Sequence, residues 1–246
     1  KYPSMIGSIK NAILTHVHLD HIALAPWLAS TWNTNLYCSS FTAKMCEMMW
    51  RDTHKVSKAE KYPLIWDLYD LDEALRLLKP TPYNTWIETG NWRWRLLNAG
   101  HIVGAAMIEI DMKHTKVLVT GDYDTRSSPT TFGAKPIETD IIFTEGTYGG
   151  KFHEKREEIE KRFLQSVENV VLRGGKVLIA AFAMGRTQDI LSILERSSYN
   201  FEIHMDGMGK QVTEKMIEHK ENIRNIEILS KAFKKVRKVT SKSDRK

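Results

Sequence analysis

Cysteine is scarce in this sequence, and long apolar runs are missing. Cys38 and Cys46 are the only thiols in 246 residues, too few for a disulfide-stapled fold. We expect both to be buried thiols in a packed helical stretch over residues 37–50, rather than a disulfide or metal ligands. No stretch reaches the roughly 18 apolar residues of a membrane span, and no signal-peptide pattern opens the chain. The sequence therefore predicts a cytoplasmic protein without membrane attachment.

Most of the chain also lacks net charge. The formal charge is +6, but residues 231–246 hold eight Lys or Arg and one Asp, so this end carries +7 and residues 1–230 carry −1. Such a basic tract suits a polyanionic partner or a solvated end, and both readings stay open. With 42% apolar residues, the chain has enough material for one large domain or two modest ones.

Apolar or alternating runs typical of strands recur along the chain. They lie at residues 11–15, 92–98, 105–110, 116–120, 140–144 and 176–181. Residues 40–89 carry helix-like patterns broken by prolines, which indicates a helical insertion. Residues 153–173 carry apolar side chains at spacings of three and four and predict a long helix with one buried face. Since the chain starts at Lys1 and a buried strand follows by residue 11, we expect a fragment of a longer protein.

The strongest chemical signal is the string Thr15-His16-Val17-His18-Leu19-Asp20-His21, directly after the first predicted strand. Alternate side chains at a strand end share a face, so His16 and His18 can converge on one cation. Where the chain turns into a helix, Asp20 and His21 can reach a neighbouring position. Imidazole and carboxylate ligands together suit zinc, and iron or manganese less well.

Two further ligand candidates follow strands. His101 stands between Gly100 and Gly104 after residues 92–98, and Asp122 follows Gly121 after residues 116–120. Strand carboxyl ends gather along one edge of an α/β layer, so both side chains are expected near the first cluster. A carboxylate such as Asp122 can bridge two cations with its two oxygens.

These motifs resemble the second, third and fourth motifs of the metallo-β-lactamase fold. The string from Thr144 to Gly149 resembles motif A of its β-CASP branch, whose members act on nucleic acids. The stretch from Ala181 to Leu191 resembles the strand, turn and helix that follow in that branch. The resemblance is closest to the archaeal and eukaryotic cleavage-and-polyadenylation endonucleases.

The resemblance implies an α/β fold with a partial metallo-β-lactamase αββα sandwich at residues 1–152, lacking its first strands and carrying the helical insertion at about 40–89. Residues 153–246 would begin an inserted, incomplete β-CASP α/β domain.

The resemblance also implies roles for individual residues. His16, His18 and His101 would hold one zinc ion, Asp20 and His21 the other, and Asp122 both. Asp20 would also accept a proton, and Glu145 would orient a later histidine that serves as proton donor. Arg186 and Thr187, at the turn before a helix, are candidates to contact an RNA phosphate.

The function implied is a zinc-dependent hydrolase of phosphodiester bonds in single-stranded RNA, acting as endonuclease, 5′-to-3′ exonuclease or both, alone, as a homodimer or within an RNA-processing complex. An aspartate expected before residue 11 and a Ser-Gly-Met stretch and two histidines expected after residue 246 have no match in the chain. One alternative is a small-molecule metallo-hydrolase of the glyoxalase or lactamase kind. The motif at residues 144–149 argues against it. A second is a catalytically silent scaffold subunit, against which the intact ligand positions stand.

Overall fold

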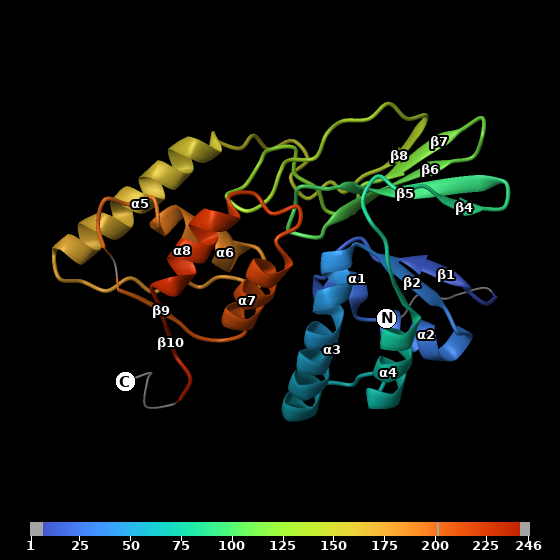
Figure 1. Ribbon diagram of the computed structural model, residues 1–246, viewed down its shortest axis with the longest axis horizontal. Coiled ribbons are helices and arrows are strands. Elements are labelled where there is room, and N and C mark those ends of the chain that lie inside the picture. The colour runs from blue at the N-terminus through green and yellow to red at the C-terminus, as the bar shows by residue number, and fades with distance from the viewer. Residues whose placement is uncertain (1–6, 201, 242–246) are drawn as a thin grey trace. The chain divides into compact units, whose positions relative to one another are not determined.

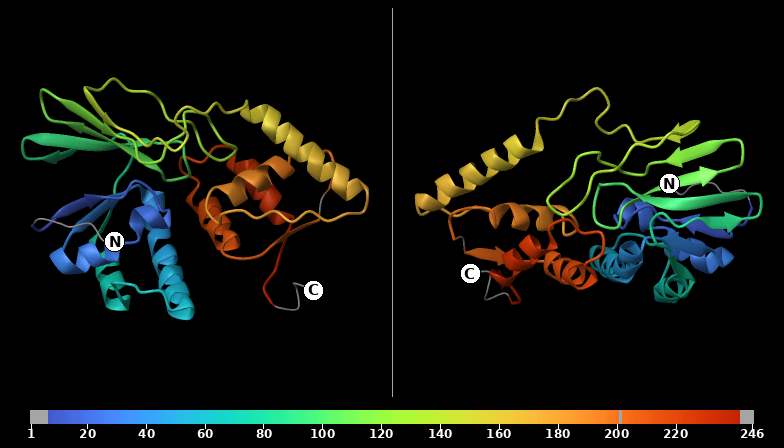
Figure 2. Two further views of the ribbon diagram at one scale, coloured as in Figure 1. Left: turned by 180° about the vertical axis from the view of Figure 1, so that it is seen from behind. Right: turned by 45° about the horizontal axis from the view of Figure 1, so that its top comes forward.

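The chain forms two compact units in the computed structural model, which describes residues 7–200 and 202–241 (Figures 1 and 2). Unit 1 comprises Gly133–Glu145 together with the described residues up to Thr125. Unit 2 comprises Arg126–Phe132 together with the described residues from Gly146 onward. The loop Arg126–Phe132 therefore belongs to unit 2, although the residues on both sides of it in the sequence belong to unit 1.

Unit 1 contains two β-sheets. The smaller one is parallel and has the order β1 (Asn11–Ile13), β2 (Asn35–Cys38), β3 (Leu78–Pro80). The larger one has the order β4 (Ile87–Thr89), β5 (Trp92–Asn98), β6 (Ala106–Asp111), β7 (Lys116–Val119), β8 (Ile141–Phe143). It is antiparallel up to β7, and β8 joins β7 in parallel. The strands β5 to β8 form at the runs that the sequence predicts.

The core of unit 1 lies between the two sheets. The inward side chains of β5 and β6 are buried, with Trp94 and Leu96 in one strand. Ile13 of β1 and Tyr37 of β2 pack against them, and the rings of Tyr37 and Trp94 lie 5.2 Å apart in a T-shaped arrangement. Because strand side chains alternate, this burial fixes the register of both sheets.

The outward side chains of β5 pair with those of β6. Arg93 lies opposite Asp111 and Arg95 lies opposite Glu109, and each pair forms an ion pair. The ring of Trp86 lies 4.4 and 4.5 Å from the two guanidinium carbons. This alternation of apolar and charged side chains explains why the sequence pattern identified β5 correctly.

Unit 1 contains four helices, and the last three of them lie on the outer side of the small sheet (Figure 1). The four helices are α1 (Leu19–Ile22), α2 (Ala25–Trp32), α3 (Ser40–Glu60) and α4 (Leu68–Leu77). The Ser39 hydroxyl accepts the Thr42 N–H at the start of α3, and Asp67 and Asp70 form a capping box at the start of α4. Unit 1 thus has the layers helix, sheet, sheet, which confirms the predicted partial αββα sandwich.

Unit 2 is mainly helical. It contains α5 (Arg156–Leu172), α6 (Arg186–Leu194), α7 (Gly209–His219), α8 (Ile226–Lys234) and a parallel pair of strands, β9 (Ile203–Met205) and β10 (Val236–Lys238). The long helix predicted at 153–173 is present as α5, but its apolar face is only partly covered, with Val167 buried and Ile159 40% exposed. Within residues 7–200 and 202–241, every helix is too short or too polar to cross a lipid bilayer.

Three sequence expectations differ from the structure. The run 176–181 is not a strand but an exposed irregular segment, with Leu178 98% exposed, because no neighbouring described strand pairs with its backbone. The stretch 40–89, predicted as helical, also contains β3 and β4, which are too short to show a pattern. Tyr37 and Cys38 lie in β2 rather than in a helix.

Candidate metal centre

The histidine string is held where the two sheets of unit 1 meet. After β1, the Leu14 N–H donates to the Tyr37 carbonyl of β2, and the Thr15 carbonyl accepts the Ala106 N–H of β6. His18 is the N-cap of α1, with an extended backbone, so Asp20 lies in the first turn of that helix. The string is therefore a strand end that bends into a helix, as its spacing predicts.

A first group of donor atoms converges on one point. It consists of Nε2 of His16, Nδ1 of His18, Nε2 of His101 and a carboxylate oxygen of Asp122, all within 4.8 Å of one another. The nitrogen of His18 lies 3.1 Å from that of His16 and 3.2 Å from that of His101. Oδ2 of Asp122 lies 3.9 and 3.7 Å from the nitrogens of His16 and His101. Three imidazoles and a carboxylate at this spacing are compatible with a bound metal ion.

A second group lies on the other side of Asp122. The Oδ1 atom of Asp122 is 3.4 Å from Nε2 of His21. The same nitrogen of His21 is 3.4 Å from Oδ2 of Asp20. The two oxygens of Asp122 thus face different sets of donors. All six residues predicted as ligands lie together.

His16 is fully buried at the centre of this cluster. The pKa of His16 is lowered to about 2. The larger cause is burial, and the neighbouring rings of His21, His101 and His18 lower it further. Its imidazole is therefore neutral throughout the physiological range. A neutral ring presents a lone pair without first having to lose a proton.

Thr15 is a contact that the sequence analysis did not single out. Its hydroxyl oxygen lies 3.2 Å from Nδ1 of His16 and 3.3 Å from Nδ1 of His21, the ring atoms opposite those that face the donor groups. Gly121 packs against the same side chain, since a Cβ there would lie 2.9 Å from the Cβ of Thr15. The positive φ of Gly121, +53°, also favours glycine. Thr15 therefore links two ligand rings to the turn that carries Asp122.

Two tryptophans hold the short helix α1 at its C-terminal end. The buried indole N–H of Trp50 donates to the carbonyl of Ile22 at 3.0 Å, and that of Trp66 donates to the carbonyl of Ala23 at 2.6 Å. These carbonyls have no partner further along so short a helix. The insertion that contains α3 thereby supports the helix carrying Asp20 and His21.

The loop around His101 depends on its glycines. Gly104 has a φ of +88°, and its carbonyl accepts hydrogen bonds from the Ser39 hydroxyl at 2.6 Å and the Thr42 hydroxyl at 2.9 Å. Gly100, with a φ of +73°, packs against the backbone of Asp124 and Gly133. A side chain at Gly100 would collide with this backbone, whereas one at Gly104 would make only a tight contact with Phe41 and Thr42. The two glycines thus hold the loop beside the cluster.

The remaining predicted site residues lie elsewhere. Glu145 follows β8 as Asp122 follows β7, and because these strands are parallel neighbours, both residues leave the sheet at the same edge. Arg186 begins α6 in unit 2, with a 58% exposed side chain whose guanidinium lies 3.7 Å from the Asp189 carboxylate. The hydroxyl and N–H of Thr187 both donate to the Phe182 carbonyl. The roles of Glu145, Arg186 and Thr187 stay predictions.

Several known proteins are similar to this chain. Residues 5–179 match the metallo-β-lactamase superfamily. Probable RNase MJ4 of Methanocaldococcus jannaschii is 31% identical over 100% of the chain, and RNase aCSPSF2 of Saccharolobus solfataricus is 30% identical over 98%. Cleavage and polyadenylation specificity factor subunit 3 of Dictyostelium discoideum is 36% identical over 78% of the chain.

The chain covers only part of each relative, namely 59%, 49% and 26% of their lengths in the same order. The superfamily match nevertheless includes every residue of the two donor groups. The chain therefore belongs to the metallo-β-lactamase superfamily, within its β-CASP ribonuclease branch of the archaeal cleavage-and-polyadenylation type.

Proposed function

We propose that this chain is part of a zinc-dependent ribonuclease that hydrolyses phosphodiester bonds of single-stranded RNA. The observation that carries the proposal is the pair of donor groups on either side of Asp122, whose two carboxylate oxygens face His16 and His101 on one side and His21 on the other. RNA is proposed as substrate because two archaeal relatives are named RNases.

The donor set fits two zinc ions. His16, His18 and His101 would hold one, Asp20 and His21 the other, and Asp122 both, since zinc takes imidazole nitrogen and carboxylate oxygen ligands. Such ions, when bound, lower the pKa of water and stabilise negative charge on phosphate oxygens.

The protein side chains supply orientation and proton transfer. The hydroxyl of Thr15 fixes the rings of His16 and His21, so their donor atoms need little rearrangement when a ligand binds. Asp20 is 79% exposed, and its carboxylate can accept the proton that the attacking water loses as its oxygen bonds to phosphorus. The 3′-oxygen then leaves, and Glu145 is proposed to orient the group that protonates it.

A chelator experiment tests the proposal. The purified chain is treated with EDTA, restored with Zn²⁺ and assayed on a labelled single-stranded RNA. We expect RNA cleavage to disappear after EDTA and to return with Zn²⁺. Cleavage that is indifferent to both steps would exclude the metal mechanism. Assays with a thioester and a β-lactam test the small-molecule alternative, and zinc content by elemental analysis tests the silent-scaffold alternative.

RNA contacts and assembly belong to the same proposal. Arg186 and Thr187 are proposed to lie near a phosphate of the substrate, and RNA affinity is then expected to fall steeply with salt. One relative is named as a subunit of a cleavage and polyadenylation factor, which supports the proposal that this protein acts within an RNA-processing complex. The alternative is a homodimer. Light scattering of the purified chain tests the homodimer, and co-purification from a cell extract tests the complex.

A further inference from the structure

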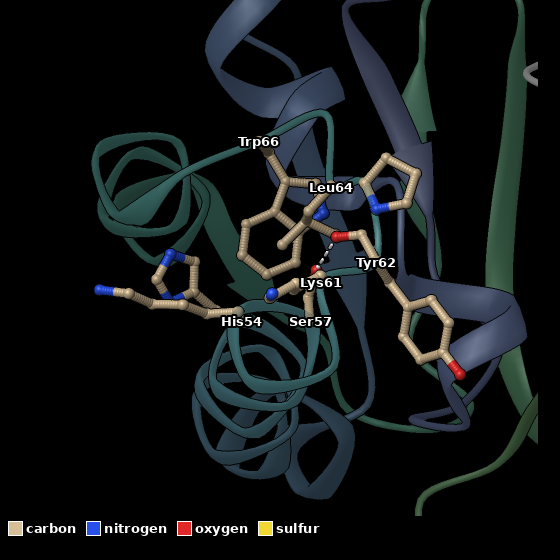
Figure 3. A pocket seen from close by; sticks show the side chains of 8 residues that line it. His54, Ser57, Lys61, Tyr62, Leu64 and Trp66 are labelled. Atoms are coloured by element: carbon tan, nitrogen blue, oxygen red, sulfur yellow. Dashed lines mark hydrogen bonds between the residues drawn. The ribbon is translucent and has the colours of Figure 1, made fainter.

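A pocket with no part in the metal centre opens in unit 1 at the C-terminal end of α3 (Figure 3). Its volume is about 490 Å³, within the range of small-ligand sites. The wall consists of the last turns of α3 and the loop that leads toward α4. Its lining includes His54, Lys58, Lys61, Tyr62, Leu64 and Trp66.

The wall of the pocket is fixed by hydrogen bonds within unit 1. The Ser57 hydroxyl donates to the carbonyl of Tyr62 at 2.6 Å (Figure 3). The Tyr62 N–H donates in turn to the carbonyl of Ser57 at 2.9 Å. Trp66 is buried and tied through its indole N–H to Ala23. A pocket with a preformed wall loses little conformational entropy when it binds a ligand.

The polar side of the pocket is cationic. Lys58 and Lys61 line it and are exposed to solvent. Neither forms an ion pair with a described residue, in contrast to Arg51 on the same helix, which pairs with Glu47. His54 adds a third nitrogen donor near them. Unpaired lysines around a cavity favour an anionic ligand.

The other side of the pocket is apolar and aromatic. Tyr62 is 66% exposed, so a ligand can reach its ring, and Leu64 and Trp66 continue the wall. The rings of His54 and Trp66 are 6.3 Å apart and inclined by 31°. An inorganic anion would leave this wall uncovered, and an aliphatic ligand would leave the lysines unpaired. A planar ring joined to a phosphate uses both sides.

We propose that this pocket binds a nucleotide unit, with its phosphate at Lys58 and Lys61 and its base against Tyr62. The chemistry is shared by a free nucleotide and by a nucleotide of single-stranded RNA. Only the choice of RNA as a source rests on the proposed function. An RNA bound here would have a contact on unit 1 additional to the metal centre.

The test uses the chain with its metals removed by EDTA, so that RNA stays intact. Adenosine 5′-monophosphate is titrated by calorimetry, and a labelled single-stranded oligoadenylate is followed by fluorescence anisotropy. We expect K58A/K61A to weaken both at least about tenfold. The slope of log affinity against log salt for the oligomer should become shallower by about 0.7, the value for one lost phosphate contact on a single strand.

Matched variants separate the pocket from general surface charge. Lys55 is exposed on the same helix but does not line the pocket, so K55A should bind both probes as the unmodified chain does. Y62A should weaken binding, and Y62F should restore it. Circular dichroism verifies that each variant is folded.

The outcomes distinguish a free nucleotide from RNA as the ligand, and they test the pocket separately from the proposed ribonuclease function. If the oligomer displaces the mononucleotide, RNA occupies the pocket; if both bind together, a free nucleotide does. The proposal is overturned if neither probe binds, or if K55A costs as much as K58A/K61A. Because these titrations contain no metal, they are independent of whether the zinc-restored protein cleaves RNA.

Discussion

At the scale of single residues, Thr15 is expected to control the affinity of the metal centre. Its hydroxyl is the shared partner of the Nδ1 atoms of His16 and His21. T15V keeps the shape of the side chain but removes that partner, so both rings lose their orientation. We expect zinc affinity to fall about 10- to 100-fold, the usual cost of losing such an outer contact. Competition with a chromophoric chelator measures it.

T15S is the matched control, because it keeps the hydroxyl and loses only a methyl group. Its zinc affinity should stay near that of the unmodified chain. If T15V bound zinc as tightly as T15S, the hydroxyl would have no positioning role, and the packing of Thr15 against Gly121 would be its main contribution.

The clustering of the candidate ligands could be predicted from the sequence, whereas the residues that support them could not. His16 and His18 alternate at a strand end, and this spacing alone places them on one face. Cys38 and Cys46 are free and buried, as predicted. Thr15, in contrast, looks like any polar residue at a turn, and its role depends on a ring nitrogen six positions away.

At the scale of elements, the tryptophans that hold α1 give a second prediction. W50F keeps an aromatic ring at a fully buried position but loses the hydrogen bond to the Ile22 carbonyl. Leaving that carbonyl unsatisfied costs about 1–3 kcal/mol and loosens the helix that carries Asp20 and His21. We expect the zinc stoichiometry at limiting metal to shift from two toward one, as measured by elemental analysis after gel filtration.

W92F is the control for this change, since Trp92 is 39% exposed at the start of β5. It should leave stoichiometry and stability unchanged. A W50F chain that is as stable as W92F and retains both ions would show that α1 needs no support from α3.

A buried carboxylate gives unit 2 a pH-dependent stability. Asp189 of α6 accepts hydrogen bonds from the hydroxyls of Ser128 and Thr130, and so anchors the loop Arg126–Phe132. Burial raises the pKa of Asp189, although the Thr130 and Ser128 hydroxyls act in the opposite direction. A raised pKa in the folded state means that this carboxyl stabilises the fold most at low pH. Its contribution is lost as pH rises from the ordinary aspartate pKa through the raised one.

D189N should remove that dependence, because the amide oxygen can still accept both hydroxyl donors. The measurement is the free energy of unfolding by denaturant across this pH range, for the variant and the unmodified chain. We expect the difference between them to change with pH over this window and to be constant above it. A difference that is constant throughout would mean that Asp189 titrates alike in both states.

Elements of unit 1 were easier to predict than those of unit 2. Strands such as β5 and β6 pack one face on a core, and the resulting alternation is visible in the sequence. The run 176–181 has the composition of a strand, but a strand needs a partner that composition does not reveal.

At the scale of the whole molecule, sequence and structure divide the chain differently. The domain ranges expected from the sequence change at residues 152 and 153, while the compact units of the structure separate between Glu145 and Gly146. The loop Arg126–Phe132 belongs to unit 2 because Arg224 and Asn225 hydrogen-bond its backbone and Asp189 holds its hydroxyls. Hydrogen bonds between residues so far apart in the chain leave no local pattern in the sequence.

The division into units predicts where zinc stabilises the protein. Every donor of the candidate metal centre belongs to unit 1. If zinc binds there, as we propose, it binds the folded form of that unit and raises its free energy of unfolding. At a free zinc concentration of 100 times the dissociation constant, the gain is about 2.7 kcal/mol. Scanning calorimetry with and without Zn²⁺ should therefore shift one transition upward and leave the other in place. T15V should reduce the shift and D189N should not, because Asp189 lies in unit 2. Equal shifts of both transitions would mean that the two units unfold as one.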